Sequence, residues 1–322
     1  LVHVSTLPLS GKRAVRHVSA ADLVIGAAAG KGDKHHYIPV FYSSEWAGPD
    51  GRVCEFSRPY DAVKPKRVHP DGTGYLRGLY TVPRNDPRVA EFIEREFFQI
   101  TDNGAARVLR MFKSGQQIAW TTDTRSAWSR FIISLMLRNP EYVARMAAEV
   151  VGFFDPTSTE LNDKYQQIRR PDDPETYEDY IAKTGHPAGR ASAIAMQTII
   201  DSPRMGGHLN QMRWSVVTFR NVKHTLLTSD RPIIMTNGIV KPRDHLALPI
   251  GPLSLFVATN TIDAENIIKR MDPRQLMEQV NDRVASQARK FVYGTDDKQL
   301  RFVANRLGRM EPSTPLETRF PA

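Results

Sequence analysis

The spacing of hydrophobic residues changes twice along the chain and divides it into three regions. Before residue 86, short alternating runs such as residues 52–56 predict strands, separated by loops rich in Pro and Gly. From 86 to 212, apolar residues recur at the spacing of helices. After 212, short apolar strands precede helical patterns that close the chain. This order predicts an α+β fold rather than a regular alternation of strands and helices.

In the N-terminal region, the segment from Pro39 to Trp46 predicts a short helix, because proline is favoured in the first helical turn. The turn residues 48–51 then lead into the strand at 52–56. Two further strands are expected, near Arg67-Val68 and over residues 79–82.

The helical region begins at Asp86, which is suited to cap a helix with Pro87 at its first position. We expect Asn103-Gly104 to bend or break this helix. A second helix is predicted to start at Thr122 or Asp123. Arg138-Asn139-Pro140 is expected to kink or end it, because the proline ring clashes with the preceding turn. Further helices are predicted over residues 141–154, 173–184 and 189–200.

The C-terminal region is predicted to open with a hairpin, in which strands 214–219 and 225–228 flank a turn at 221–224. Strands over 233–235, 246–250 and 253–257 and helices over 263–271, 273–290 and 296–309 are expected to follow. We expect one α+β domain over residues 34–310, with residues 86–212 as its helical insert. Residues 1–33 and 311–322 are expected to be flexible tails.

The chain of 322 residues carries a net charge of +9 and has a pI near 9.6, a charge balance that is frequent in nucleic-acid-binding proteins. Lys64, Lys66 and Arg67 form its one tight basic cluster, and elsewhere basic and acidic residues alternate. There is no basic run and no repeat in which basic and aromatic residues interleave. A generally basic surface is therefore favoured over a dedicated nucleic-acid groove, and nucleic acid or a nucleotide stays a predicted partner.

Cys54 is the only cysteine, so the chain can form neither an intramolecular disulfide nor a cysteine-rich zinc site. This composition is typical of the reducing cytoplasm, where we expect the protein to reside. The longest purely apolar stretch, residues 131–137, is too short to cross a bilayer, so no membrane association is predicted. The basic residues before the apolar stretch at 20–29 loosely resemble a signal peptide, but Asp22 interrupts that stretch.

Two adjacent histidines, His35 and His36, form the first cluster with chemical potential. On an extended chain they point to opposite faces, so one can enter a pocket while the other packs or meets solvent. A neutral imidazole binds metal ions, and histidine exchanges protons near neutral pH. The alternative is a structural histidine that is hydrogen-bonded to the backbone.

A second polar cluster, Ser229-Asp230-Arg231-Pro232, follows an apolar strand, where loops often carry functional groups. Asp230 can act as a general base or metal ligand, or it can cap the turn through its own backbone. Glu91, Glu94 and Glu96 flank a buried helical stripe, so some of them lie at its edge, although a solvated helix face is the ordinary place for at least two of them. Arg138 ends an apolar helix, where it can pair with the helix C-terminus or with an inward acid.

The chain contains no Walker loop, no dinucleotide-binding glycine pattern, no His-Glu-x-x-His and no Gly-x-Ser-x-Gly motif. The lack of a glycine-rich phosphate cradle argues against an ATPase or a dehydrogenase. The functional classes with strong local motifs are therefore not indicated.

Taken in order, these segments resemble the signature of domain-of-unknown-function family 4238, a group of mostly bacterial proteins. That family opens with His-His-Tyr-x-Pro, which residues 35–39 match. It continues with a helix that carries an acid, an arginine before a proline, a Ser-Asp-x-Pro turn and an Asn-bearing helix. The corresponding residues here are Glu94, Arg138, Ser229-Asp230 and Asn281. The resemblance spans residues 34 to 293, and it departs at Thr101-Asp102, where the family often has a second glutamate.

The resemblance implies a shared pocket but carries no activity, and it leaves two functions open. The first is a metal-dependent hydrolase that acts on phosphodiesters in nucleic acid or nucleotides and binds Mg²⁺, Mn²⁺ or Zn²⁺. Its expected catalytic residues are His35, His36, Asp230 and Glu94, the last three of these being the candidate metal ligands. Its expected substrate-binding residues are Arg138, Tyr37, Ser229 and Asn281. The second function is a non-catalytic module of a stress or defence system that binds nucleic acid or a nucleotide, in which the same residues form a buried hydrogen-bond network.

Overall fold

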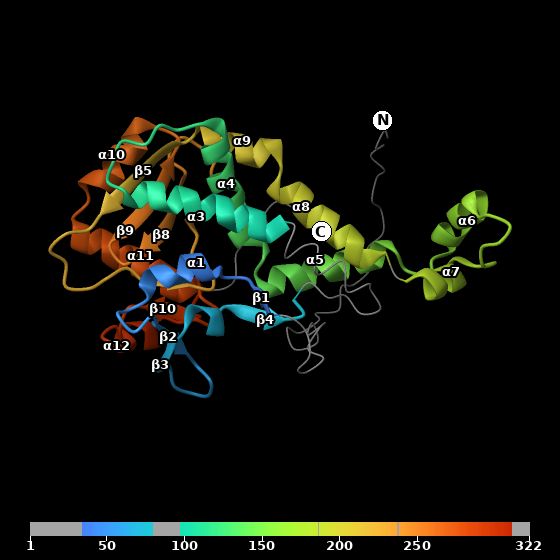
Figure 1. The fold of residues 1–322 in the computed structure, drawn as a ribbon, viewed down its shortest axis with the longest axis horizontal. Coiled ribbons are helices and arrows are strands. Elements are labelled where there is room, and N and C mark those ends of the chain that lie inside the picture. The colour runs from blue at the N-terminus through green and yellow to red at the C-terminus, as the bar shows by residue number, and fades with distance from the viewer. Residues whose placement is uncertain (1–33, 80–96, 186, 237, 311–322) are drawn as a thin grey trace.

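The computed structural model describes residues 34–79, 97–185, 187–236 and 238–310. In this part of the chain, short N-terminal strands precede a helical region and a C-terminal antiparallel sheet with closing helices, which confirms the predicted α+β class (Figure 1). The predicted tails at 1–33 and 311–322 and the predicted helix start at Asp86 lie outside the described residues. No helix in the described part of the chain is long and apolar enough to span a membrane.

The N-terminal segment is anchored by a small antiparallel sheet of β1 (Lys34–His36) and β4 (Tyr75–Arg77). After β1, the N–H groups of Tyr37 and Ile38 both donate to the carbonyl oxygen of Gly74, at 2.9 and 3.0 Å. Pro39 then precedes the helix α1 (Val40–Ser43) and the 3-10 turn η1 (Ser44–Trp46), as predicted. Tyr42 and Trp46 are fully buried, so these turns are held in the core.

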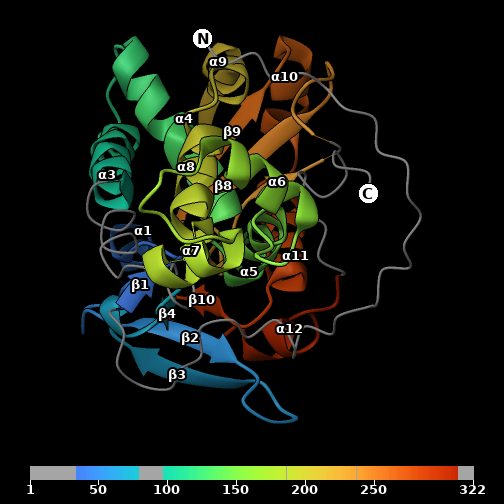
Figure 2. The ribbon, with the colours of Figure 1, turned by 90° about the vertical axis from the view of Figure 1, so that its right-hand side faces the viewer.

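One four-stranded antiparallel sheet joins the two ends of the domain, in the order β3-β2-β10-β6. The strands β2 (Val53–Ser57) and β3 (Lys64–Val68) form a hairpin, which lies at the bottom of Figure 2. The strand β10 (Val292–Gly294) pairs with β2 on one side and with β6 (Thr228–Ser229) on the other. This pairing places the turn at Asp230 beside the C-terminal aromatic strand.

The other four-stranded antiparallel sheet separates two hydrophobic cores. Its order is β5 (Arg213–Thr218), β9 (Ser254–Thr259), β8 (His245–Gly251) and β7 (Ile234–Met235). Alternate residues of a strand point to opposite faces, so Leu248 and Phe256 enter the core that contains Trp128. Ala247 and Val257 enter the core that contains Val284 of the closing helices. Burial on both faces explains why the runs at 246–250 and 253–257 are continuously apolar.

The helices α3 (Gln99–Lys113) and α4 (Thr122–Leu137) pack closely beside this sheet. Thr121 and Thr124 form a capping box at the start of α4, and Arg138 is the C-cap at its end, which lies where the sequence predicts. The helix α3 continues through Asn103-Gly104, so the break that was one of the two expectations there does not occur. A Cβ atom at Gly104 would lie 3.2 Å from the Cβ of Ala127, so the glycine serves the close approach of α3 to α4.

Two helices that the apolar pattern did not predict are α6 (Thr159–Ile168) and α9 (Pro203–Gln211). With α7 (Tyr177–Thr184), α6 lies at the far end of α5 (Pro140–Phe153) and α8 (Ala188–Ile200), on the right of Figure 1. The sequence of α6 is largely polar and that of α9 contains two glycines, so neither helix shows a clear apolar stripe. Serines at the N-caps of both helices accept a hydrogen bond from the first turn, and these serines are the signal that sequence reasoning missed.

The predicted hairpin between residues 214–219 and 225–228 is wrong. The strand β5 pairs with β9, whereas Thr228 belongs to β6 in the other sheet. Between them the chain crosses from one sheet to the other, with the N–H of Leu226 donating to the carbonyl of Pro252 at 2.7 Å. The strand expected at 79–82 lies outside the described residues except for Leu79, which is in a turn after β4.

The closing helices are α10 (Ile262–Arg270), α11 (Pro273–Gln287) and α12 (Leu300–Ala304). The first two match the predicted ranges, and α12 is shorter than the predicted helix at 296–309. Leu276, Val280 and Val284 on α11 face the second core, so α11 covers the face of the sheet opposite α4.

Gly74 offers a test of the contact between the β1 and β4 segments. Its φ is +64°, and a Cβ atom there would lie 3.0 Å from the Cβ of Ile38. We expect Gly74→Ala to lower the free energy of unfolding by about 1–3 kcal/mol, measured by urea denaturation. Gly115 is the control, because its φ is +68° but a methyl group there would meet nothing within 4 Å. Equal losses for the two alanine variants would contradict a tight contact at Gly74.

Candidate functional site

A cavity of about 140 Å³ lies where the β1–β4 sheet, the start of α5, the turn after β6 and the segment before β10 meet. Two of the predicted site residues, Tyr37 and Asp230, line it. Its other lining residues are Tyr75, Leu76, Asn139, Pro140, Glu141, Arg231 and Lys290. The His-His-Tyr-x-Pro segment and the Ser-Asp-x-Pro turn, almost two hundred residues apart in the sequence, therefore border one space.

The carboxylate of Asp230 ties the turn after β6 to the segment that enters β10. Its oxygens accept the backbone N–H groups of Arg289, Lys290 and Phe291, at 2.9, 2.6 and 3.1 Å. The N–H of Asp230 in turn donates to the carbonyl of Phe291 at 3.0 Å. Asp230 is thus a structural anchor that also forms part of the cavity wall.

Burial raises the pKa of Asp230 to about 6, even though its three N–H donors favour the ionised form. The nearby carboxylate of Glu141 acts in the same direction as burial. A carboxyl group that titrates near neutral pH is a frequent feature of functional sites, and it also occurs in buried structural networks. Here the hydrogen bonds show the structural role directly.

Beside Tyr37, a buried polar network continues from the cavity into the interior. The hydroxyl of Thr73 donates to Glu55, and its oxygen lies 3.0 Å from that of Tyr293. Burial raises the pKa of Glu55, although the hydrogen bond from Thr73 opposes the change. Burial also raises the pKa of Tyr37, and the charges of Asp230 and Glu141 add to this effect. Burial acts on Tyr293 in the same way and raises its pKa, so both tyrosines stay protonated. Because Thr73 donates its proton to Glu55, the Tyr293 hydroxyl donates to Thr73.

The two histidines have different surroundings. His35 is buried on β1, opposite Leu76 of β4. His36 is half-buried, and its Nε2 donates to the carbonyl of Asp71 at 3.2 Å, because a carbonyl only accepts. Burial lowers the pKa of His36, while the backbone and charge of Asp71 oppose this change. His36 is next to the cavity-lining Tyr37 in the chain, and its ring packs edge-on against that of Tyr75, which also lines the cavity, with centroids 5.6 Å apart.

Arg138 is fully buried at the end of α4, where it binds Asp102 of α3. Its Nη1 and Nη2 donate to the two carboxylate oxygens, at 3.1 and 2.6 Å, and Nη2 also donates to Ser134. Asp102, the acid of the Thr101-Asp102 pair, is therefore held by an arginine. The next residue, Asn139, lines the cavity, so this ion pair fixes one of its walls.

Ser229 and Asn281 are buried and hold the main chain. The Ser229 hydroxyl accepts the N–H of Arg231 at 3.1 Å. The side-chain oxygen of Asn281 accepts the N–H of Leu227 at 2.8 Å, and its Nδ2 donates to the carbonyl of Thr225 at 2.9 Å. Neither residue lines the cavity, and Asn281 secures the crossing that leads into β6.

Glu94 lies outside the described residues, so its position relative to the cavity stays a prediction. Within the described ranges, no three His, Cys, Asp or Glu side chains are placed to share a metal ion. The described residues alone therefore do not assemble the expected metal site, which includes Glu94.

Three charged residues at the cavity, Arg231, Glu141 and Lys290, were not assigned a role from the sequence. Arg231 is largely buried, with 12% of its side chain exposed, and its Nη2 donates to Glu141 at 3.2 Å. Its Nε is buried and has no hydrogen-bond partner in the described part of the protein. Lys290 lines the same cavity and is exposed. Arg231 follows Asp230 and Lys290 precedes the aromatic strand, so proximity to those motifs was the available signal.

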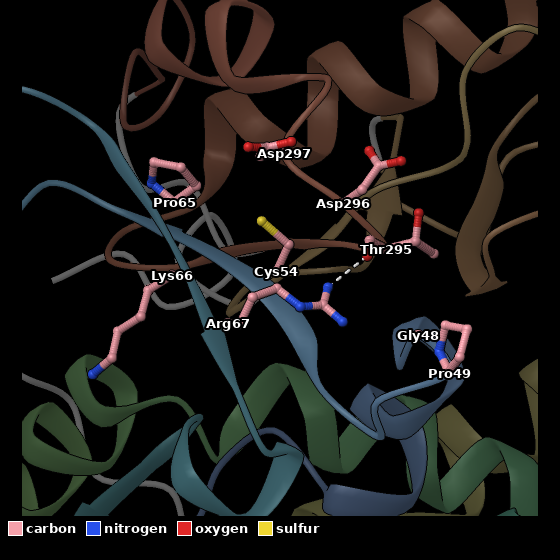
Figure 3. A pocket seen from close by; sticks show the side chains of 9 residues that line it. All are labelled: Gly48, Pro49, Cys54, Pro65, Lys66, Arg67, Thr295, Asp296 and Asp297. Atoms are coloured by element: carbon pink, nitrogen blue, oxygen red, sulfur yellow. Dashed lines mark hydrogen bonds between the residues drawn. The ribbon is translucent and has the colours of Figure 1, made fainter.

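Another cavity, of about 390 Å³, lies beside β2 and β3 and contains none of the predicted site residues (Figure 3). Cys54 lies within it, but burial raises the pKa of this thiol to about 11, so the thiol stays protonated at neutral pH. Arg67 is held by Asp50 and by the carbonyls of Arg52 and Thr295. We therefore place the candidate site at the cavity that contains Asp230.

A family model described as "Protein of unknown function (DUF4238)" matches residues 34–298. The chain belongs to the DUF4238 family. No curated protein and no solved structure shows a match to it. The matched range begins with β1 and ends just before α12, so it includes all three sheets and every residue that lines the Asp230 cavity.

Asp230 predicts a definite pH dependence for this DUF4238 protein. Its folded pKa of about 6 exceeds the ordinary value of 3.8, so the folded state binds the proton more tightly. Protonation of Asp230 therefore stabilises the folded state. This contribution to the free energy of unfolding is fully present below about pH 4, and as the pH rises through about 6 up to roughly 3 kcal/mol of it is lost. We expect the difference in unfolding free energy between the wild type and Asp230→Asn to decrease over this interval.

Urea denaturation at a series of pH values measures this difference. The comparison with Asp230→Asn cancels the other titrating groups, including His36. A difference that is constant or increases with pH would contradict the assignment.

Proposed function

We propose that this DUF4238 protein is a non-catalytic module that binds a phosphate group of a nucleotide or nucleic acid at the Asp230 cavity. The observation that carries the proposal is the buried Nε of Arg231, which lacks a hydrogen-bond partner in the described part of the protein. An unsatisfied buried donor is costly, and a guanidinium group is well suited to bind phosphate oxygens. Lys290 at the same cavity supplies a second cation.

The size of the cavity supports a small group rather than a whole ligand. At about 140 Å³ it is smaller than the usual pocket for a drug-sized molecule, which has about 300–1,000 Å³. A phosphate fits such a space, while the sugar and base of a nucleotide would remain at its entrance. Among the lining residues, Leu76 provides an apolar surface and Tyr75 an aromatic one, with Lys34 Nζ 4.9 Å from the centre of its ring. Aromatic rings are common stacking partners of bases.

The contacts of the predicted catalytic and substrate-binding residues support binding rather than catalysis. Asp230 accepts three backbone N–H groups, Arg138 binds Asp102, and Asn281 holds the main chain near Leu227. These interactions fix the loops around the cavity, which is the role that a hydrogen-bond network plays in a binding module.

Glu141 provides a test in which binding is expected to strengthen. It is exposed and holds Arg231, so it competes with a phosphate for the guanidinium group. We expect Glu141→Gln to tighten the binding of a 5′-phosphorylated single-stranded oligonucleotide and Arg231→Gln or Lys290→Ala to weaken it, each by about tenfold. Fluorescence anisotropy measures the binding, and the same oligonucleotide with a 5′-hydroxyl group shows whether the phosphate is recognised.

The matched control is Glu149→Gln, because Glu149 lies on the same helix and forms an exposed ion pair with Arg145. This variant has the same change in net charge, and we expect it to leave the affinity unchanged. Equal effects of the two glutamine variants would show a nonspecific charge effect. No preference for the phosphorylated end would overturn the proposal.

A metal-dependent phosphodiester hydrolase is the second candidate. Two observations favour it. Asp230 lines the cavity and its carboxyl group has a pKa of about 6. Tyr37, the residue after His36, lines the same cavity. In this version His36, Asp230 and Glu94 would hold Mg²⁺, Mn²⁺ or Zn²⁺. The metal would supply a Lewis acid and an activated water.

Metal binding distinguishes the two candidates. On the hydrolase hypothesis, one of these ions raises the melting temperature of the wild type, and Glu94→Gln removes that increase without changing the metal-free melting temperature. Cleavage of a labelled oligonucleotide should then require the ion and fall by about a hundredfold or more in His36→Ala. If no ion changes the melting temperature and no cleavage occurs, the hydrolase hypothesis fails and phosphate binding can still be measured.

A further inference from the structure

The helices α6 and α7 form an arm, residues 155–184, that projects from the rest of the protein. It lies beyond α5 and α8 on the right of Figure 1 and comes toward the viewer in Figure 2. The structure describes all residues of this arm, and among them only Tyr165 and Ile181 are buried. The arm thus has almost no core of its own and none in common with the sheets.

Local contacts hold the arm in a defined shape. The ring of Tyr165 packs against those of Tyr177 and Tyr180, with centroids 6.0 and 5.1 Å apart. Its hydroxyl donates to the carbonyl of Pro174 at 2.7 Å, and the N–H of Tyr177 donates to Asn162 at 3.0 Å. Both helices also have capped N-termini. The arm therefore presents an ordered surface.

Large apolar side chains are exposed on the arm and on the helices that carry it. Ile168 at the end of α6 is 78% exposed, and Phe153 at the end of α5 is 74% exposed. Val151 on α5 and Ile194 on α8 are also exposed. Exposed apolar surface of this kind, with polar residues around it, is a frequent feature of protein interfaces.

The charge of the arm is opposite to that of the remainder of the chain. Residues 155–184 contain eight Asp or Glu and four Lys or Arg, which gives a net charge of −4. Because the whole chain has a net charge of +9, the residues outside the arm carry +13. Opposite charge steers association and selects partners, so the body of a second copy is electrostatically suited to receive the arm.

We propose that the arm docks onto the body of a second copy of this chain, with Ile168 and Phe153 buried in the contact. The acidic residues of the arm then face the basic body of the partner. This contact gives the projecting helices the burial that they lack within one copy.

Sedimentation velocity of the full chain over a concentration series tests the proposal. The wild type is expected to self-associate, and Ile168→Ser is expected to raise the dissociation constant about tenfold or more. The matched control is Ile267→Ser on α10, because Ile267 is 61% exposed on a helix far from the arm in the sequence. The double variant Asp172→Lys and Glu175→Lys should also weaken association, because it reverses charge on the arm.

Cross-linking identifies the surfaces in contact. Copies labelled with ¹⁵N are mixed with unlabelled copies, and an amine-reactive reagent is expected to join Lys164 or Lys183 of one copy to a lysine outside the arm of the other. A wild type that stays monomeric throughout the series would overturn the proposal and leave the arm to a different protein. Equal effects of Ile168→Ser and Ile267→Ser, or cross-links between copies that never involve the arm, would overturn it as well.

Discussion

The arrangement of the candidate site depends on one buried interaction, the acceptance of three backbone N–H groups by the carboxylate of Asp230. This interaction fixes residues 289–291 against the turn after β6. The same contact therefore fixes the backbone positions of Arg231 and Lys290, whose side chains line the cavity. A carboxylate with so many donors has little freedom to move, which makes it a good anchor for neighbouring groups.

Other buried polar groups extend this principle to the rest of the fold. Asn281 holds the chain where it crosses from one sheet to the other, and Arg138 joins the end of α4 to α3. Each of these side chains secures a segment that hydrophobic packing alone would leave undefined. Loss of one partner in such a pair leaves a buried polar group unsatisfied, which is costly. The polar residues that the sequence singles out, such as Asp230, Asn281 and Arg138, therefore hold loops and chain crossings in place.

The sequence predicted the parts of this structure that depend on local pattern. Pro39, Thr122 and the apolar runs at 246–250 and 253–257 mark elements that the structure contains close to the expected positions. It failed where the outcome depends on distant partners. Residues 225–228 look like the second strand of a hairpin, but β10, more than sixty residues later, is the strand that pairs with Thr228. Gly104 looks like a helix breaker, although its lack of a side chain serves the contact with Ala127. The candidate site shows the same division. Tyr37 and Asp230 are cavity residues that the sequence also singled out, and an inward acid was one of two partners that it left open for Arg138. That this acid is Asp102 follows only from packing. Arg231 was overlooked because its significance comes from a buried Nε without a partner in the described part of the protein.

On the proposed function, phosphate binding and the protonation of Asp230 are coupled. The cavity holds two cations, Arg231 and Lys290, and two carboxyl groups, Glu141 and Asp230. Protonation of Asp230 removes one negative charge from its wall, so it favours an anionic ligand. By reciprocity, a bound phosphate raises the pKa of Asp230 further above about 6. The buried carboxyl group that organises the loops would then also determine how strongly the cavity binds an anion near neutral pH.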